Sequence, residues 1–223
     1  AHAPKTHIGE VEVGQYADSD NEKALPFSRV TRDIYLSSLS RPASLENSTG
    51  YALNAPFAID QTLWRQALDD IAMQSDMLRA RIGKSDKPYQ DGAYFVIGDK
   101  PNLDFHFIDL SQEGLSQEAI DQRLEAFIMQ PFAIDEDPLA RFYMVKTSDK
   151  NYWLALAVHH ILYDGFASSM HLQHCINRYQ ELVAQSTNTY TINDICVEAF
   201  SEQWQQLNLP SIAFSPGYIS VYR

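Results

Sequence analysis

The chain has 223 residues, 45% of them hydrophobic and 12% aromatic, so it can bury a core without disulfide support. Its 29 acidic residues against 17 basic ones give a formal charge of -12, which repels a nucleic-acid backbone and an anionic membrane surface alike. These values favour a globular protein and argue against nucleic acid or a membrane as a partner.

Cysteine content and hydropathy indicate the compartment. Two cysteines, Cys175 and Cys196, are too few for a disulfide framework, and Cys175 falls on the apolar stripe of an expected helix. No apolar run approaches the ~20 residues that a membrane helix needs, and residues 1–15 lack the apolar segment of a secretory signal. We therefore expect a cytoplasmic protein.

Helices and strands are expected to alternate through the N-terminal half, after a polar, acidic leader or linker over residues 1–24. Side-chain caps and apolar spacing locate the elements. In chain order they are a helix capped by Ser28 that carries Ile34, Tyr35 and Leu36, an extended segment over 50–59, a helix capped by Asp60 that runs to about Gln74, strands over 93–97 and 103–108, and a helix that Ser116 opens.

The C-terminal half begins with two strand-like runs, 141–146 and 152–158, whose short polar connection predicts an antiparallel hairpin. Helical spacing of apolar residues then recurs over 172–183 and again over 197–207, and the tail 209–223 ends in an incipient strand. Strands interleaved with helices predict an α+β fold, a mixed α/β sandwich rather than a strictly parallel winding.

One segment concentrates residues that can carry out chemistry. It places His159 and His160 at the end of an apolar strand, followed by Asp164 and Gly165 before a helix. A histidine exchanges protons near physiological pH, a nearby carboxylate can orient it, and glycine lets the backbone approach a ligand closely. A purely structural reading is also open, in which the histidines are hydrogen-bonded core residues and Asp164 caps the helix.

The spacing His-His-x-x-x-Asp-Gly over residues 159–165 resembles the signature of condensation domains of nonribosomal peptide synthetases, which belong to the chloramphenicol-acetyltransferase-like superfamily. The resemblance extends over about residues 25–183. It implies that residues 25–208 are the N-terminal lobe of a two-lobed domain and that residues 209–223 lead toward a second lobe. The stretches that support it are Leu25–Ser28, Ile34–Leu36, Gln74–Ile82, Pro131–Phe132 and Asp137–Arg141.

The resemblance implies an acyltransferase-type enzyme that forms an amide between two carrier-bound thioesters. His160 is then the catalytic histidine, the Gly165 backbone amide is a candidate for polarising the oxyanion, and His159 is structural. The implied partners are donor and acceptor carrier-protein domains, the second lobe and adjacent synthetase modules. The only implied cofactor is the 4'-phosphopantetheine of the carriers. Because the active site lies between two lobes, we expect little turnover from this chain alone, whether it is a truncated half or a natural one.

The resemblance also implies that Asp164 pairs with an arginine that holds the loop. We expect Arg79 in this role, with Arg81 as the alternative, because a planar guanidinium donates two hydrogen bonds to a buried carboxylate.

Four other readings remain open. The chain is also compatible with an epimerisation domain of the same superfamily, a stand-alone acyltransferase, or a non-catalytic lobe that docks carrier proteins. His171 and His174 have the helical spacing of two zinc ligands, although no third ligand is evident.

Overall fold

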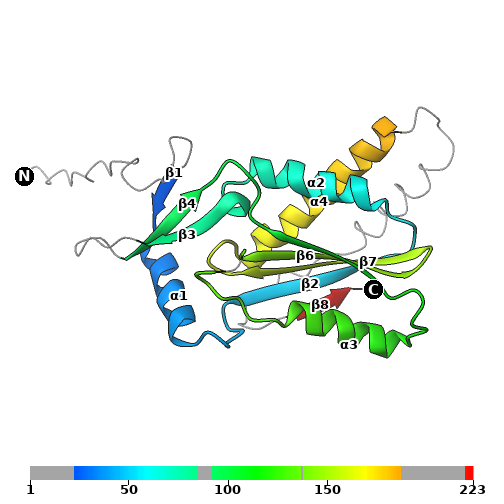
Figure 1. Ribbon diagram of the computed structural model, residues 1–223, viewed down its shortest axis with the longest axis horizontal. Helices are drawn as coiled ribbons and strands as arrows, with labels where there is room; N and C mark the ends of the chain where they lie inside the picture. The colour runs from blue at the N-terminus through cyan, green and yellow to red at the C-terminus, as the bar shows by residue number, and fades with distance from the viewer. Residues whose placement is uncertain (1–22, 85–91, 137, 187–218, 223) are drawn as a thin grey trace, which may run out of the picture.

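The computed structural model describes residues 23–84, 92–136, 138–186 and 219–222, whose strands form two sheets (Figure 1). The strands are β1 (Lys23–Pro26), β2 (Ser48–Ala55), β3 (Ala80–Lys84), β4 (Ala93–Ile97), β5 (Asp104–Asp109), β6 (Ala140–Ser148), β7 (Asn151–His159) and β8 (Ile219–Tyr222). The helices are α1 (Arg29–Ser40), α2 (Gln61–Gln74), the short 3-10 helix η1 (Met77–Arg79), α3 (Gln117–Ile128) and α4 (Gly165–Ser186).

The larger sheet has the strand order β5-β6-β7-β2-β8 and contains both strand orientations. β6 and β7 form the predicted antiparallel hairpin, and β2 adds antiparallel to β7. The two outer strands, β5 and β8, run parallel to their neighbours. The smaller sheet, of order β1-β4-β3, is antiparallel. This mixed arrangement confirms the predicted α+β class.

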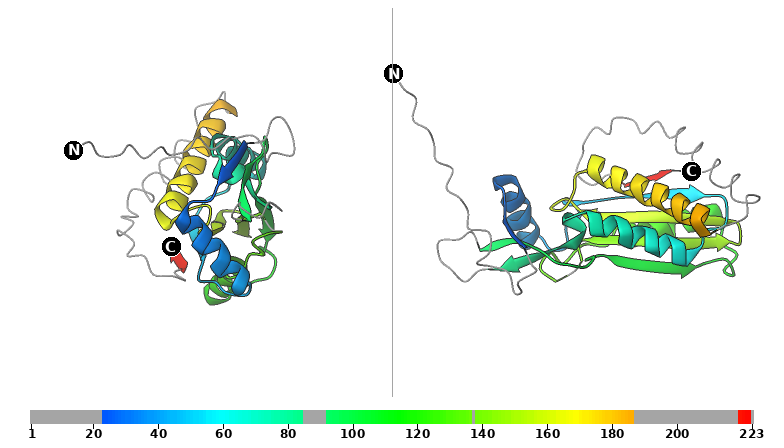
Figure 2. Two further views of the ribbon diagram at one scale, coloured as in Figure 1. Left: turned by 90° about the vertical axis from the view of Figure 1, so that its left-hand side faces the viewer. Right: turned by 90° about the horizontal axis from the view of Figure 1, so that it is seen from above.

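Helices cover both faces of the larger sheet. α2 and α4 run side by side over one face and α3 lies across the other, while α1 stands beyond the end of the sheet next to the smaller sheet (Figures 1 and 2). Residues 152–159 of β7 are consequently all buried, which explains their continuous apolar character. A β-carbon at Gly50 would lie 2.7 Å from the Leu156 carbonyl oxygen and against Ile128, so glycine lets α3 approach β2 closely.

Local capping chemistry sets the helix starts as predicted. Ser28, Asp60 and Ser116 each accept a hydrogen bond from the backbone N–H three residues on, at the starts of α1, α2 and α3. The helix capped by Ser28 carries Ile34, Tyr35 and Leu36 as predicted; it buries Tyr35 and Ser38 and leaves Leu36 54% exposed.

The outcome differs among the other predicted elements. Of the extended segment expected over residues 50–59, only residues 50–55 are strand, within β2 (Ser48–Ala55). The strand expected in the C-terminal tail is β8. The helix predicted over 197–207 and Cys196 lie outside the described residues, whereas Cys175 is buried in α4. Among the described helices, none combines the length and apolar content that crossing a membrane requires.

Candidate functional site

The two histidines lie where β7 leaves the larger sheet. His159 is the last residue of β7, opposite Ser48 at the start of β2, and its backbone N–H donates to the Leu139 carbonyl (2.9 Å). The next backbone N–H, that of His160, donates to the Asn47 carbonyl (2.7 Å). A tight turn follows, closed by the Leu162 N–H on the His159 carbonyl (3.0 Å), and α4 begins. Backbone hydrogen bonds alone therefore fix the positions of both histidines, independently of their side-chain contacts.

The His159 side chain is buried, 3% exposed, and uses both ring nitrogens. Nδ1 accepts from the Ile161 backbone N–H (3.1 Å), so in the neutral ring the proton is on Nε2, which donates to Ser38 Oγ (3.0 Å). Ser38 in turn donates to the Ile34 carbonyl (2.9 Å) and accepts from Asn47 Nδ2 (3.0 Å). The ring thereby joins β7 to α1 and to the loop before β2.

The buried position keeps His159 neutral. Burial, followed by the neighbouring charge of His160, lowers its pKa from 6.5 to about 4. Protonation would also place a hydrogen on Nδ1 against the Ile161 N–H, which is itself a donor. His159 therefore has neither an accessible lone pair nor a proton to exchange near neutral pH.

His160 has the opposite character. Its side chain is half-buried, and Nδ1 lies 3.2 Å from the Tyr163 backbone carbonyl oxygen. Because a carbonyl oxygen only accepts hydrogen bonds, Nδ1 carries the proton in this contact and Nε2 keeps its lone pair. In the described part of the chain Nε2 has no hydrogen-bond partner. The ring is thus oriented at one nitrogen and available as a proton acceptor at the other.

Asp164 caps α4 rather than pairing with an arginine. Its carboxylate is exposed and accepts from the Ala167 backbone N–H (2.8 Å), while its carbonyl accepts from both the backbone N–H (3.1 Å) and the hydroxyl (2.6 Å) of Ser168. No arginine forms an ion pair with it among the residues that the structure describes. The buried ion pair expected for Asp164 is therefore wrong, and the helix cap is what the structure contains.

Arg79 lies in η1 and is occupied elsewhere. Its guanidinium donates to the Asp76 carboxylate (2.6 Å) and to the Gly98 carbonyl (2.6 Å). A partner three residues away costs little chain entropy to bring close, so the local carboxylate is preferred over Asp164. The alternative, Arg81, lies on β3 opposite Val96.

Gly165 is the first residue of α4. The Asp164 carboxylate caps this helix through the N–H of Ala167. The first N–H groups of a helix have no partner within the helix and carry its positive dipole end. A helix start of this kind is a general position for binding an anionic oxygen.

Distant elements supply supporting residues that motif spacing does not reveal. The buried Arg141 of β6 donates to the carbonyls of Gln130 (3.0 Å) and Pro131 (3.1 Å), and its guanidinium lies 4.0 Å from the Phe132 ring centroid. Phe132 in turn packs edge-on against His159 (6.0 Å between centroids). Like Ser38, these residues join the site only through tertiary packing.

The zinc hypothesis gains no third ligand. The His171 and His174 rings lie 6.3 Å apart on α4, and His171 packs against Tyr163 (4.4 Å between centroids). Within the described residues, no group of three or more histidine, cysteine, aspartate or glutamate side chains is placed to hold a metal ion.

Comparison with known proteins decides the family. A family model for the condensation domain matches residues 21–208. The chain belongs to the condensation domain family. This family comprises the acyltransferase-type, amide-forming domains of nonribosomal peptide synthetases, so the resemblance carried by residues 159–165 is confirmed.

Relatives of this condensation domain are large synthetases. Bacitracin synthase 3 of Bacillus licheniformis is 26% identical over 168 residues, which are 74% of this chain and 3% of that protein. Chondramide synthase cmdD of Chondromyces crocatus is 24% identical over 215 residues, 96% of this chain and 5% of that protein. The chain thus spans only a small part of these relatives.

Solved condensation domains share the fold. The starter condensation domain of rhizomide synthetase RzmA superposes with a TM-score of 0.66 at 20% identity, covering 83% of this chain and 46% of that one. The first condensation domain of the CDA synthetase gives a TM-score of 0.63 at 16% identity, covering 82% and 46%. The chain therefore spans less than half of each solved domain.

Proposed function

We propose that residues 25–208 are the N-terminal lobe of a condensation domain in which His160 assists amide formation between two carrier-bound thioesters. The observation that carries this proposal is the fixed His160 ring. Its Nδ1 faces the Tyr163 carbonyl at 3.2 Å, which leaves the Nε2 lone pair to meet a substrate amine. The leader or linker expected over residues 1–24 then ends before Lys23, where β1 begins. The tail over 209–223, expected to lead toward the second lobe, first contributes β8 to the larger sheet.

The reaction needs a proton acceptor at one stage. An α-amine has an ordinary pKa of ~8, so part of it is already neutral at pH 7 and attacks the donor thioester carbonyl without prior deprotonation. Attack forms the C–N bond and makes the nitrogen cationic; His160 Nε2 takes the proton released there. When the C–S bond breaks, the departing thiolate of the donor arm recovers that proton. Orientation of the amine by the same nitrogen contributes as well.

The oxyanion needs a donor at the same stage. We assign this to the first amide of α4, at Gly165, because the positive dipole end of a helix stabilises negative charge on a carbonyl oxygen. His159 and Asp164 hold the backbone on either side of this amide, through the bonds to Ser38 and Ala167. We assign both a structural role, as we do Arg79, which ties η1 to the end of β4.

Several partners are part of the proposal. Synthetase relatives support donor and acceptor carrier-protein domains, adjacent modules, and 4'-phosphopantetheine supplied by the carriers as the arm of each substrate. Coverage of 46% of each solved domain supports a second lobe as the opposite wall of the site. The isolated chain is then expected to turn over little substrate.

The test compares His160→Ala with His159→Gln in the complete domain, supplied with loaded donor and acceptor carriers. We expect His160→Ala to reduce amide formation about 10²- to 10⁴-fold, the usual contribution of a general base, and His159→Gln to reduce it far less. Thermal unfolding of both variants controls for folding. Equal losses in two folded variants would contradict the assignment. Exchange of the acceptor α-proton without amide product would identify epimerisation instead.

A further inference from the structure

Tyr163 occupies the turn between the catalytic histidine and α4, and its two ends face different parts of the molecule. Its backbone carbonyl accepts from His160 Nδ1 (3.2 Å). Its side chain extends the other way, where the hydroxyl forms a hydrogen bond with Ser75 Oγ and the ring packs on His171 (4.4 Å between centroids).

Ser75 is a firm anchor for this hydroxyl. It is the C-cap of α2, and its backbone N–H donates to the Ala72 carbonyl (3.1 Å), so the end of the helix fixes its position. Its Oγ also accepts weakly from the Leu78 N–H at the start of η1 (3.4 Å). The Tyr163 hydroxyl is neutral near pH 7, because burial raises its pKa to about 12. The bond to Ser75 therefore does not change across the physiological range.

We propose that the Tyr163 side chain is a positioning residue for His160: its bond to Ser75 fixes the residue whose carbonyl selects the Nδ1–H tautomer. This proposal rests on the catalytic role proposed for His160. The peptide that carries the carbonyl lies between two fixed points, the turn closed on His159 and the Asp164 cap of α4. Rotation of the carbonyl away from His160 requires rotation about the Tyr163 backbone, and the side-chain anchor opposes that rotation.

The choice of tautomer matters for the chemistry. With the proton on Nδ1, Nε2 presents a lone pair; with the proton on Nε2, the same atom presents a hydrogen and cannot accept a proton from an amine. A ring freed from the carbonyl exchanges between the two forms. Loss of the bond between Tyr163 and Ser75 therefore reduces the fraction of His160 rings that carry the proton on Nδ1, without removing any catalytic atom.

The test reads the tautomer directly on the 223-residue chain, by ¹⁵N NMR of the His160 ring at a pH where the ring is neutral. The signals are assigned by their absence in His160→Gln. Wild type is expected to show a pyrrole-type Nδ1 and a pyridine-type Nε2. Tyr163→Phe and Ser75→Ala are each expected to move both signals toward the values of mixed tautomers. The double variant is expected to move them no further, because each single change already removes the bond between the Tyr163 hydroxyl and Ser75.

Tyr179→Phe is the matched control. Tyr179 also uses a hydroxyl to join α4 to α2, accepting from the Asp60 N–H (3.0 Å), but at the opposite end of α2. It is expected to leave the His160 signals unchanged. Unchanged signals in folded Tyr163→Phe and Ser75→Ala would overturn the proposal, as would an equal change in Tyr179→Phe. If Tyr163→Phe does not fold, Ser75→Ala decides, because Ser75 caps α2 through its backbone.

A kinetic measurement in the complete domain extends the test. Tyr163→Phe is expected to lower kcat about three- to tenfold with KM unchanged, because substrate contacts are retained and fewer rings accept the proton. An active His160→Ala variant would refute the proposed function while leaving the NMR result intact. A changed tautomer with unchanged kcat would refute the kinetic role of the anchor alone.

Discussion

Two adjacent histidines, His159 and His160, have opposite bonding at this site because their surroundings differ. His159 ends β7 and bonds to Ser38 of α1, while His160 belongs to the turn that follows. Burial and two hydrogen bonds hold His159 in one neutral tautomer. His160 has one nitrogen bound and the other open. The environment of each residue, rather than its type, separates the ring bonded at both nitrogens from the ring bonded at one.

The neutral state of His159 predicts a pH dependence of stability. Its pKa is about 4 in the folded chain and 6.5 ordinarily, so between these values the unfolded chain binds the additional proton. The contribution to the free energy of unfolding is complete above pH 6.5 and declines as the pH falls toward 4. The total loss from this residue is about 3 kcal/mol, at 1.36 kcal/mol for each unit of pKa difference.

Urea unfolding of wild type and His159→Gln across pH 4 to 8 checks this prediction. Carboxylates that titrate in the same range are common to both proteins, so their effects cancel when the free energy of unfolding of the variant is subtracted from that of wild type. The stability advantage of wild type is expected to be largest above pH 6.5 and to shrink toward pH 4. An advantage that stays constant with pH would show that the ring is not held neutral.

Helix starts were predictable from sequence because they depend on neighbours within three residues. Ser28, Asp60 and Ser116 each cap the helix that immediately follows, and the β6–β7 hairpin likewise depends on a short connection. The parallel pairing of β5 with β6 depends on a partner more than thirty residues away and was not predicted.

The candidate site shows the same difference between features set by near neighbours and features set by distant residues. The motif located His159 and His160, since four residues of one segment define it. The bond between Ser38 and His159 spans 121 positions and leaves no local signal. The error over Arg79 has the same origin, because a distant carboxylate was preferred over Asp76, three residues away.

The cap of α4 predicts how Asp164 variants behave. Asp164→Ala removes the acceptor for the Ala167 N–H and is expected to lower stability by about 1 kcal/mol, with the chain still folded. Asp164→Asn retains a capping oxygen and is expected to cost only a few tenths of that, since asparagine caps helices about as well as aspartate. Thermal unfolding of the two variants checks this. Equal losses of several kcal/mol in both would instead indicate a buried ion pair.

At the scale of the whole molecule, contacts run without a break from the smaller sheet to the histidines. Phe95 of β4 packs on Phe27 (4.8 Å between centroids), and Phe27 packs on Tyr35 of α1 (5.5 Å). One turn further along α1, Ser38 accepts from His159. The two sheets are hydrogen-bonded separately, yet their buried side chains belong to one apolar cluster. The smaller sheet therefore supports the site through α1.

This continuity predicts that both sheets unfold together. Phe95→Ala in the smaller sheet and Leu124→Ala in α3 are each expected to cost about 3 to 5 kcal/mol, because both side chains are buried in the shared cluster. Native-state hydrogen exchange is the measurement. Each variant is expected to lower the opening free energy of the most protected amides equally in β4 and in β7, whether the change lies in the smaller sheet or in α3.

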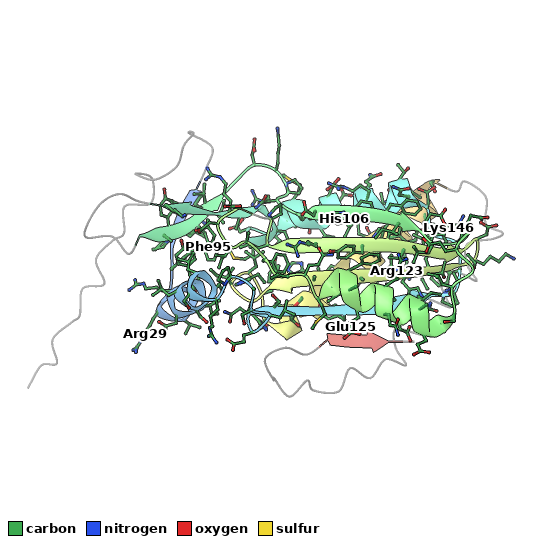
Figure 3. The ribbon with its side chains drawn as sticks, turned by 60° about the horizontal axis from the view of Figure 1, so that its bottom comes forward. Arg29, Phe95, His106, Arg123, Glu125 and Lys146 are labelled. Atoms are coloured by element: carbon green, nitrogen blue, oxygen red, sulfur yellow. The ribbon has the colours of Figure 1, made fainter. Side chains whose placement is uncertain are left out.

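Phe107→Ala is the matched control, since Phe107 lies on the edge strand β5 and is 39% exposed. Figure 3 shows this strand at the border of the larger sheet, marked by His106, with Phe95 in the other sheet. The control is expected to cost about 1 kcal/mol or less. Loss of protection confined to β4 in Phe95→Ala would mean that the smaller sheet opens independently. In that case α1 could not transmit its support to Ser38 and His159, and the site would depend on the larger sheet alone.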